Sequence, residues 1–356
     1  MSSFRARSSS APKPKGDVMA QRPPERHVLW SSLWIALFCV ACHRGASPYD
    51  QALARATEHA RRGELEDAQQ DYKNAHDLGR DQDERVEALY RALSLKKDAK
   101  GLIRLARNHP SATRAPRCLL DAGRIYQRAG QTEQALAAFR ELVLSYPQSA
   151  SAPSGLREIL RELLSQDPSG GASLAFLAQN RTHLGPLDEE VRYREAALLE
   201  SSDPDAAILA YEELARRYPL PEGVFADEAL LRAATLRRAR GDIDGALLVL
   251  MEMKKANEKA LMVGSYTRSS YADAAYLYAT VLRDDKRDLG AAARAFEAFP
   301  SEFPKSRLRD DAIEAAARVY LMLGEGARAC ATIRSLADVD PESRYRKKEP
   351  EFCGGD

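Results

Sequence analysis

The sequence predicts an all-α protein: an α-solenoid of about eight helical hairpins that form a right-handed superhelix, preceded by a disordered leader and a signal peptide. Three observations support this prediction. Alanine, leucine, arginine and glutamate are abundant, and these residues favour helices because they lose little entropy there. Small and bulky apolar residues recur in one register that closes with a proline. A short apolar run precedes the first of these segments.

Composition and charge limit the classes of partner. Hydrophobic residues make up 44% of the chain and charged residues 29%, which allows a folded core. The net charge is +1, and residues 1–41 contain six Lys or Arg and two Asp or Glu. The other residues therefore carry 47 basic and 50 acidic side chains, a net charge of −3. This near-neutral body argues against nucleic acid, which would need a concentrated basic surface.

The N-terminus reads as a targeting segment. Residues 1–27 are polar and rich in Ser, Pro and Arg, and should be disordered. Residues 28–42 (VLWSSLWIALFCVAC) are apolar but too short to cross a bilayer, which takes about 20 residues. With Arg22 and Arg26 before it, this run is typical of a secretory signal. The alternatives are an uncleaved signal anchor or a short apolar helix, and translation could start at Met1 or at Met19.

The end of the apolar run, residues 39–42 (CVAC), resembles the bacterial lipobox. The resemblance implies signal cleavage after Ala41 and attachment of diacylglycerol, with a fatty acid such as palmitate, to Cys42. His43 follows the cysteine, which by analogy with the enterobacterial sorting rule favours the periplasmic face of the outer membrane. Anchoring to the inner membrane and secretion to the periplasm are the alternatives. Lipid attachment would hold the protein on a membrane surface without spanning it.

The clearest repeat covers residues 115–149. Small residues would let two antiparallel helices approach closely, aromatic residues would fill the space between hairpins, and a proline would end the second helix. A glycine marks the turn between the helices. The residues in question are Leu119, Ala122, Gly123, Tyr126, Gly130, Ala135, Phe139, Leu142 and Pro147.

The same register recurs along the chain. Residues 49–79, 227–257 and 310–341 repeat it, and second helices of further units end at Pro219 and Pro304. Intervals 82–110 and 152–184 have helical composition and the right length, so we interpret them as degenerate units. An irregular helical bundle is the alternative fold. We therefore divide the chain into a leader with a signal peptide (1–41), a tether (42–48), the solenoid (49–341) and a C-terminal tail (342–356).

These units resemble tetratricopeptide repeats, which have a period of about 34 residues. The segments SYPQS (145–149), RYPLP (217–221) and EFPKS (302–306) resemble the turns between units in one bacterial subset. That subset includes the lipoprotein family of the outer-membrane β-barrel assembly machinery (BamD-like) and the periplasmic cell-division coordinator family. The resemblance implies a protein that binds other proteins or peptides in a concave groove lined by the first helix of each hairpin.

In this register the groove-facing side chains are Arg124, Gln127, Thr235, Arg238 and Arg318. Several arginines favour acidic or carboxylate-bearing ligands, because a guanidinium binds a carboxylate through two hydrogen bonds. The alternative is that these arginines only keep the surface soluble.

We find no sequence pattern for catalysis, a metal site or a cofactor. No phosphate-binding loop and no nucleophile motif occur, and we expect each of the six histidines to be an exposed helix or loop residue. Cys118 should pack inside a helix. Cys330 and Cys353 could form a disulfide that holds the tail over the last hairpin, or could be two thiols. The basic run at residues 344–348 should lie in a solvated tail.

The resulting function is a lipid-anchored periplasmic scaffold for protein–protein interaction, with a role in outer-membrane protein assembly as its most specific form. The alternatives are an accessory protein of cell-wall synthesis or cell division, a non-catalytic superhelical part of a cell-wall hydrolase, and a soluble cytoplasmic adaptor. We expect no enzymatic activity, no small-molecule substrate and no nucleic acid. The chain's own membrane contact would be made through the lipid on Cys42.

Overall fold

The computed structural model describes residues 46–220, 223–262 and 268–354. Within these ranges the chain is all-α and no strand occurs, which confirms the predicted fold class. The leader, the cleavage position Ala41 and the lipidation position Cys42 lie outside the described residues. None of the described helices is both long and apolar enough to traverse a membrane. The chain divides into two compact units, one that ends at Arg80 and one that begins at Asp81.

The first unit contains one hairpin, made of α2 (Pro48–Arg62) and α3 (Leu65–Leu78). Ser47 caps the start of α2 in a reciprocal hydrogen-bonded box with Asp50, which satisfies amide groups that the helix leaves unpaired. Gly63 ends the helix in the left-handed conformation, with φ of 79°. The two helices bury Ala56, Ala68, Tyr72 and Ala75, as the register of residues 49–79 predicts, and Ala52 is buried beside them.

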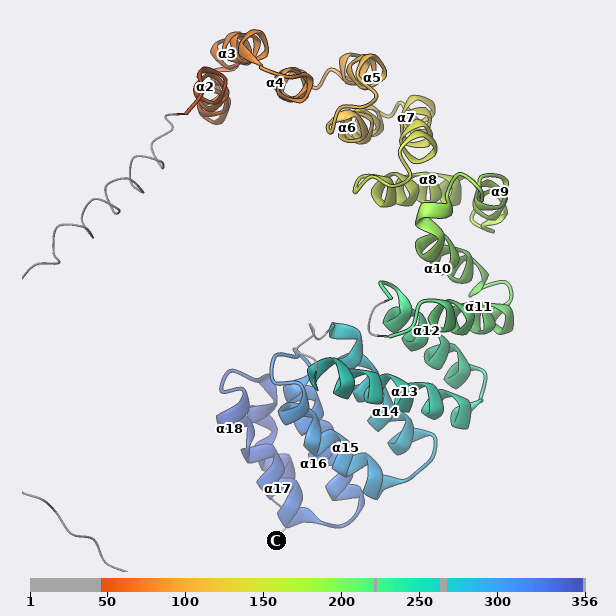
Figure 1. Cartoon of the computed structure of the whole chain (residues 1–356). Coiled ribbons are helices and arrows are strands. Elements are labelled where there is room, and N and C mark those ends of the chain that lie inside the picture. Colours follow the sequence, from red (N-terminus) through yellow and green to blue (C-terminus); the bar gives the residue numbers. More distant parts are fainter. Residues whose placement is uncertain (1–45, 221–222, 263–267, 355–356) are drawn as a thin grey trace, which may run out of the picture. The chain divides into compact units, whose positions relative to one another are not determined.

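The second unit continues the pattern with seven more helical hairpins in its described part (Figure 1). Each helix from α4 to α17 contacts the next one along the chain. The first helices are α4 (Gln82–Leu95), α6 (Ala115–Arg128), α8 (Ala152–Gln166), α10 (Asp188–Leu199), α12 (Ala226–Ala239), α14 (Ser269–Asp284) and α16 (Arg309–Met322). The second helices are α5 (Ala99–Asn108), α7 (Thr132–Ser145), α9 (Gly171–Gln179), α11 (Pro204–Arg217), α13 (Ile243–Met262), α15 (Leu289–Glu302) and α17 (Gly326–Arg334).

The hairpin of α6 and α7 shows why the repeat needs small residues. Gly123 lies on α6 opposite the ring of Phe139, which is 1% exposed. A Cβ at position 123 would stand 2.7 Å from Cδ1 and from Cζ of that ring, so any side chain there would collide with it. Gly130 forms the turn with φ of 70°, a conformation that side chains other than glycine rarely adopt. The motif residues of 115–149 therefore have the packing roles that the sequence predicts.

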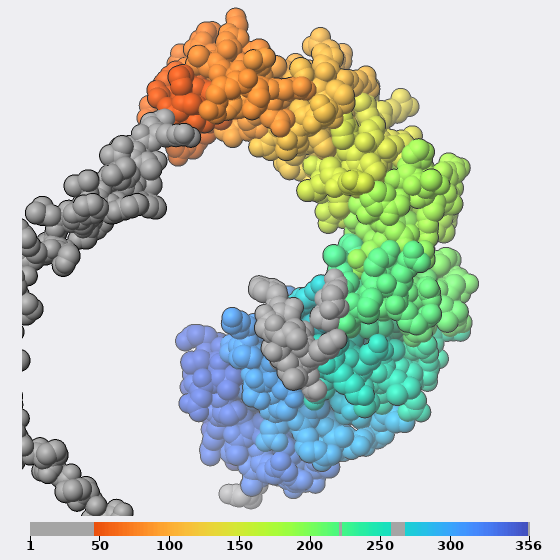
Figure 2. Space-filling view, viewed as in Figure 1, coloured from red at the N-terminus to blue at the C-terminus, as the bar shows by residue number. Residues whose placement is uncertain are grey.

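The two intervals that match the motif poorly are also helical pairs. Residues 82–110 form α4 and α5, and residues 152–184 contain α8 and α9. A short 3-10 helix, η1 (Gly185–Leu187), connects α9 to α10. The core of this part of the chain runs through α4 to α10, and a second core cluster runs from α10 to the C-terminal helix. In the space-filling view, successive helices of this unit lie in contact in the order of the sequence (Figure 2).

Acidic residues near the start of first helices accept hydrogen bonds from the turn that leads into the next hairpin. Asp83 of α4 accepts hydrogen bonds from the amide and hydroxyl groups of Thr113, at 2.9 Å each. Glu189 of α10 likewise accepts a 2.7 Å bond from the amide of Phe225, which precedes α12. These bonds satisfy backbone and side-chain donors in the turns that enter the next hairpin.

The tail is folded, although most of the basic run is exposed to solvent as predicted, namely Arg344, Arg346 and Lys347. After the short helix α18 (Leu336–Val339), the 3-10 helix η2 (Arg344–Lys348) and α19 (Glu349–Cys353) pack on α16 and α17. Phe352 is 3% exposed, and Cys353 forms a disulfide with Cys330 of α17, with 4.8 Å between their Cα atoms. The acidic face of α16 attracts the basic run: Lys348 binds Glu314 at 3.2 Å.

Candidate binding groove

Three consecutive first helices line one open pocket of about 560 Å³. Its walls come from α6, α8 and α10, so the first helices share a surface here, as the repeat register predicts. The volume lies within the range of about 300–1,000 Å³ that ligand pockets occupy. We call this site the arginine pocket; it is lined by Arg124, Ser154, Arg157, Glu158, Leu160, Arg161, Leu164, Arg194, Ala197 and Leu198.

Of the five predicted groove residues, Arg124 lines this pocket and Gln127 contacts one of its lining residues. Arg124 lines the pocket, and its guanidinium is 3.9 Å from the carboxylate of Asp121, one turn away on α6. Gln127 donates a 3.4 Å hydrogen bond from Nε2 to Glu158 of α8, so it joins two neighbouring first helices. Both side chains therefore lie on the surface that α6 and α8 share.

The other three predicted residues lie elsewhere and have partners of their own. Thr235 is exposed on α12 and donates to the carbonyl of Leu231 in the same helix. Arg238 binds Asp285, at 2.7 Å, at the end of α14. Arg318 binds Glu314 at 2.6 Å and lies over the ring of Phe352, 5.5 Å from its centre, so the folded tail contacts it. The five residues are thus not brought together in one site.

Sequence reasoning missed Arg157, Arg161 and Arg194, which come from α8 and α10. Their segments match the repeat motif poorly, so no position in them was assigned to the groove. A signal was nevertheless present: Arg157 follows Arg124 by 33 residues, and Arg194 follows Arg157 by 37. Arginines at the spacing of one unit would place guanidinium groups on the same surface of successive first helices.

The carboxylate of Glu190 is bonded to Arg194, one of the arginines that line the pocket. Glu190 of α10 is 5% exposed and accepts a 3.2 Å hydrogen bond from Nη2 of Arg194. Burial raises the pKa of Glu190, and this effect outweighs the opposing hydrogen bond and charge of Arg194. Arg194 therefore compensates a charge that the surroundings disfavour.

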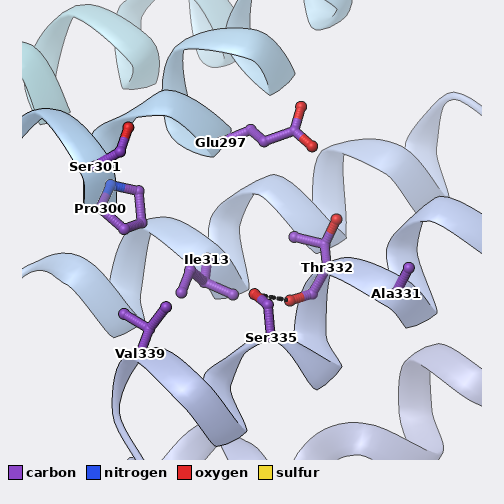
Figure 3. A pocket seen from close by; sticks show the side chains of 8 residues that line it. All are labelled: Glu297, Pro300, Ser301, Ile313, Ala331, Thr332, Ser335 and Val339. Carbon is purple, nitrogen blue, oxygen red and sulfur yellow. Dashed lines mark hydrogen bonds between the residues drawn. The ribbon is translucent and has the colours of Figure 1, made fainter. Parts of the chain in front are cut away.

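A second pocket, of about 430 Å³, is lined by residues of α15, α16, α17 and α18 near the C-terminal end (Figure 3). Apolar groups of Pro300, Ile313, Ala331 and Val339 form much of its lining, with Glu297, Ser301, Thr332 and Ser335 beside them. Glu297 is already bonded to the hydroxyl of Tyr320 at 2.6 Å, and Ser335 donates to the carbonyl of Thr332 at 2.7 Å. Two of the polar groups in this lining therefore already have partners within the protein.

Among the described residues, Cys118 and His59 form no site comparable to the arginine pocket. Cys118 is buried on α6, and burial raises the pKa of its thiol to about 12, so it is a packing residue as predicted. In the first unit, His59, Glu64 and Asp67 bring their ligand atoms within 4.8 Å of one another, a proximity that the sequence spacing did not reveal. Glu64 and Asp67 are exposed, and such exposed acidic groups are common without a bound ion.

The comparisons with known proteins concern the repeat and the fold. Residues 117–149, which span α6 and α7, match the family model of the tetratricopeptide repeat. No curated protein matches the chain. Among solved structures, the chain is similar to a chain of the "APC/C hetero-tetramer Cut9-Hcn1", with a TM-score of 0.39 and 12% identity over 92% of this chain and 59% of that one. It thus spans about 59% of that relative.

A second similar structure is the "TPR2AB-domain:pHSP90-complex of yeast Sti1", with a TM-score of 0.30 and 16% identity. That similarity covers 79% of this chain and 100% of the other. Arrays of this kind use extended surfaces to bind other proteins and are typically not catalytic. Residues 117–149 are thus similar to a tetratricopeptide repeat, and the other helical hairpins of the described chain continue the same architecture, which suggests protein–protein interaction.

Proposed function

We propose that this protein is a lipid-anchored scaffold of the bacterial cell envelope that binds segments of other proteins across its first helices and catalyses no reaction. The observation that carries the proposal is the arginine pocket, where α6, α8 and α10 present one surface with charged and apolar groups side by side. Surfaces built from successive repeats suit extended protein segments better than small substrates.

Two further observations support export and anchoring. The lipobox-like residues 39–42 favour lipid attachment at Cys42, and the disulfide between Cys330 and Cys353 suits an oxidising compartment such as the periplasm. With His43 after the lipidated position, we place the protein at the periplasmic face of the outer membrane, with a role in outer-membrane protein assembly.

The test of binding is site-directed photo-crosslinking in cells that produce the full chain. A photoreactive residue at Ala197, exposed in the arginine pocket, should join a defined partner protein. The matched control places the same residue at Arg216, exposed on α11, where no defined product should form. Equal, diffuse products from both positions would contradict binding at this surface.

The test of anchoring is mass spectrometry of the mature N-terminus, with Cys42→Ala as the control. We expect a diacylated Cys42 in the membrane fraction and an unprocessed, unacylated chain for the variant. Recovery of an unmodified Cys42 thiol from the cytosol would overturn the envelope location, while the crosslinking experiment would still report on binding.

A further inference from the structure

The arginine pocket has more positive charge than its own carboxylates can balance closely. Four guanidinium groups line it, from Arg124, Arg157, Arg161 and Arg194, together with one lining carboxylate, Glu158. Two carboxylates outside the lining, Asp121 and Glu190, pair with Arg124 and Arg194. Glu158 is paired with Arg161. Arg157 donates to the hydroxyl of Ser154 at 3.1 Å and, among the described residues, has no ion pair. At least one guanidinium of the pocket is thus available to an anionic group.

Arg194 supplies an independent indication of a missing acceptor. Its Nε is buried and has no hydrogen-bond partner among the described residues, while its Nη2 binds Glu190. A buried donor without an acceptor is costly, and buried polar groups in folded proteins are nearly always paired. The Arg194 side chain as a whole is 27% exposed and lines the pocket, where a ligand carboxylate would meet its positive charge.

The rest of the lining is apolar. Leu160 is 5% exposed, and Leu164, Ala197 and Leu198 lie beside it on α8 and α10. A small inorganic anion would meet the arginines and leave these groups in water. A purely apolar ligand would leave the guanidinium groups without a partner and displace their water. The lining therefore matches a ligand that carries both kinds of group.

From this arrangement we infer that the arginine pocket binds an extended segment of a partner protein in which acidic side chains lie next to an apolar one. The inference rests on the proposed function and specifies which side chains a partner segment must carry to bind in the arginine pocket. The acidic groups bind Arg157 and Arg194, and the apolar side chain packs on Leu160 and Leu198. A short extended segment carries both kinds of group within a few residues of each other.

The probe is a fluorescent 12-residue peptide of alternating Asp and Leu, blocked at both ends so that it has no terminal carboxylate. Fluorescence anisotropy with the full chain should give saturable binding that weakens as salt is raised. Replacing every Asp with Asn, or every Leu with Ser, should each weaken binding at least about tenfold, which is 1.4 kcal/mol at 25 °C. Inorganic phosphate at matched ionic strength should not displace the peptide.

Arg157→Gln is the first variant, because among the described residues it breaks no ion pair, and it should weaken binding about tenfold. Arg194→Gln alone would leave Glu190 buried without its partner, so the second variant is Arg194→Gln with Glu190→Gln. The control, Arg216→Gln on α11, should bind like the original protein, and circular dichroism should show equal helicity for all.

Equal affinity for the Asp and Asn peptides, or unchanged binding in the Arg157→Gln variant, would overturn the inference. Displacement by phosphate would point to a plain anion site and overturn it as well. A partner crosslinked at position 197 that lacks such a segment would refute the inference and leave the proposed scaffold function intact.

Discussion

Replacing Gly123 with alanine tests the packing of the tetratricopeptide hairpin most directly. In an exposed helix this change stabilises a protein by about 0.5–1 kcal/mol, because alanine loses less backbone entropy than glycine. Here the new Cβ would stand 2.7 Å from two ring atoms of Phe139 and closer still to a third. That ring is 1% exposed and cannot move into solvent. Overpacking of a core costs about 1–3 kcal/mol, so the expected net loss is roughly 1–2 kcal/mol.

The assay is urea unfolding followed by circular dichroism, with two companion variants. Gly326→Ala at the start of α17 is the matched control, because nothing lies within 4 Å of its Cβ position, and it should stabilise slightly. Phe139→Leu combined with Gly123→Ala should be less destabilised than the sum of the two single changes, because the smaller side chain gives the Cβ room. If Gly123→Ala raises the unfolding midpoint as much as Gly326→Ala does, the close-approach argument is wrong.

The remaining predictions concern the cysteines and one carboxylate. Replacing Cys330 and Cys353 with serine should lower the free energy of unfolding by about 3 kcal/mol, since the bond closes a loop with a sequence separation of 23; urea unfolding measures this, and reduction of the unaltered protein should have the same effect. Cys118 should resist alkylation at pH 8 until urea unfolds the protein, because burial raises its pKa to about 12; peptide mapping that finds it alkylated in the native state would contradict its burial. Burial alone would raise the pKa of Glu87, but hydrogen bonds that include one from Arg114 outweigh it and hold the pKa below the usual 4.5. The stability that this carboxylate contributes should thus be present above pH 4.5 and lost as the pH falls further. The melting temperature of the Glu87→Gln variant should therefore fall less than that of the original protein as the pH is lowered below 4.5.

The hairpins were predictable because their signals are local. The close approach of two helices is indicated by the small residues Gly123 and Ala135, and the end of the second helix by Pro147. The same types of residue recur one unit later. Even the degenerate intervals folded into helical pairs, because length and composition suffice when neighbours provide the packing. The lipid anchor at Cys42 stays a prediction, since it lies outside the described residues.

The site was harder to predict, because its members are set by contacts between hairpins. We predicted Arg318 to face the groove from its position in the helix. No signal near Arg318 in the sequence indicates that Phe352 packs against it. Arg157 and Arg194 lie in units whose weak motifs hid their register. The basic run at 344–348 resembled a solvated tail, because its acidic partners lie about one unit earlier, as with Lys348 and Glu314.

The disulfide between Cys330 and Cys353 reinforces the C-terminal end of the array. In a linear array each unit is stabilised by its immediate neighbours, so an end unit has half the support of an inner one and frays first. The bond joins α17 to α19, so the tail cannot leave α17 without reduction of the bond. A protease that cuts between these two helices under oxidising conditions should therefore leave α19 covalently attached to α17.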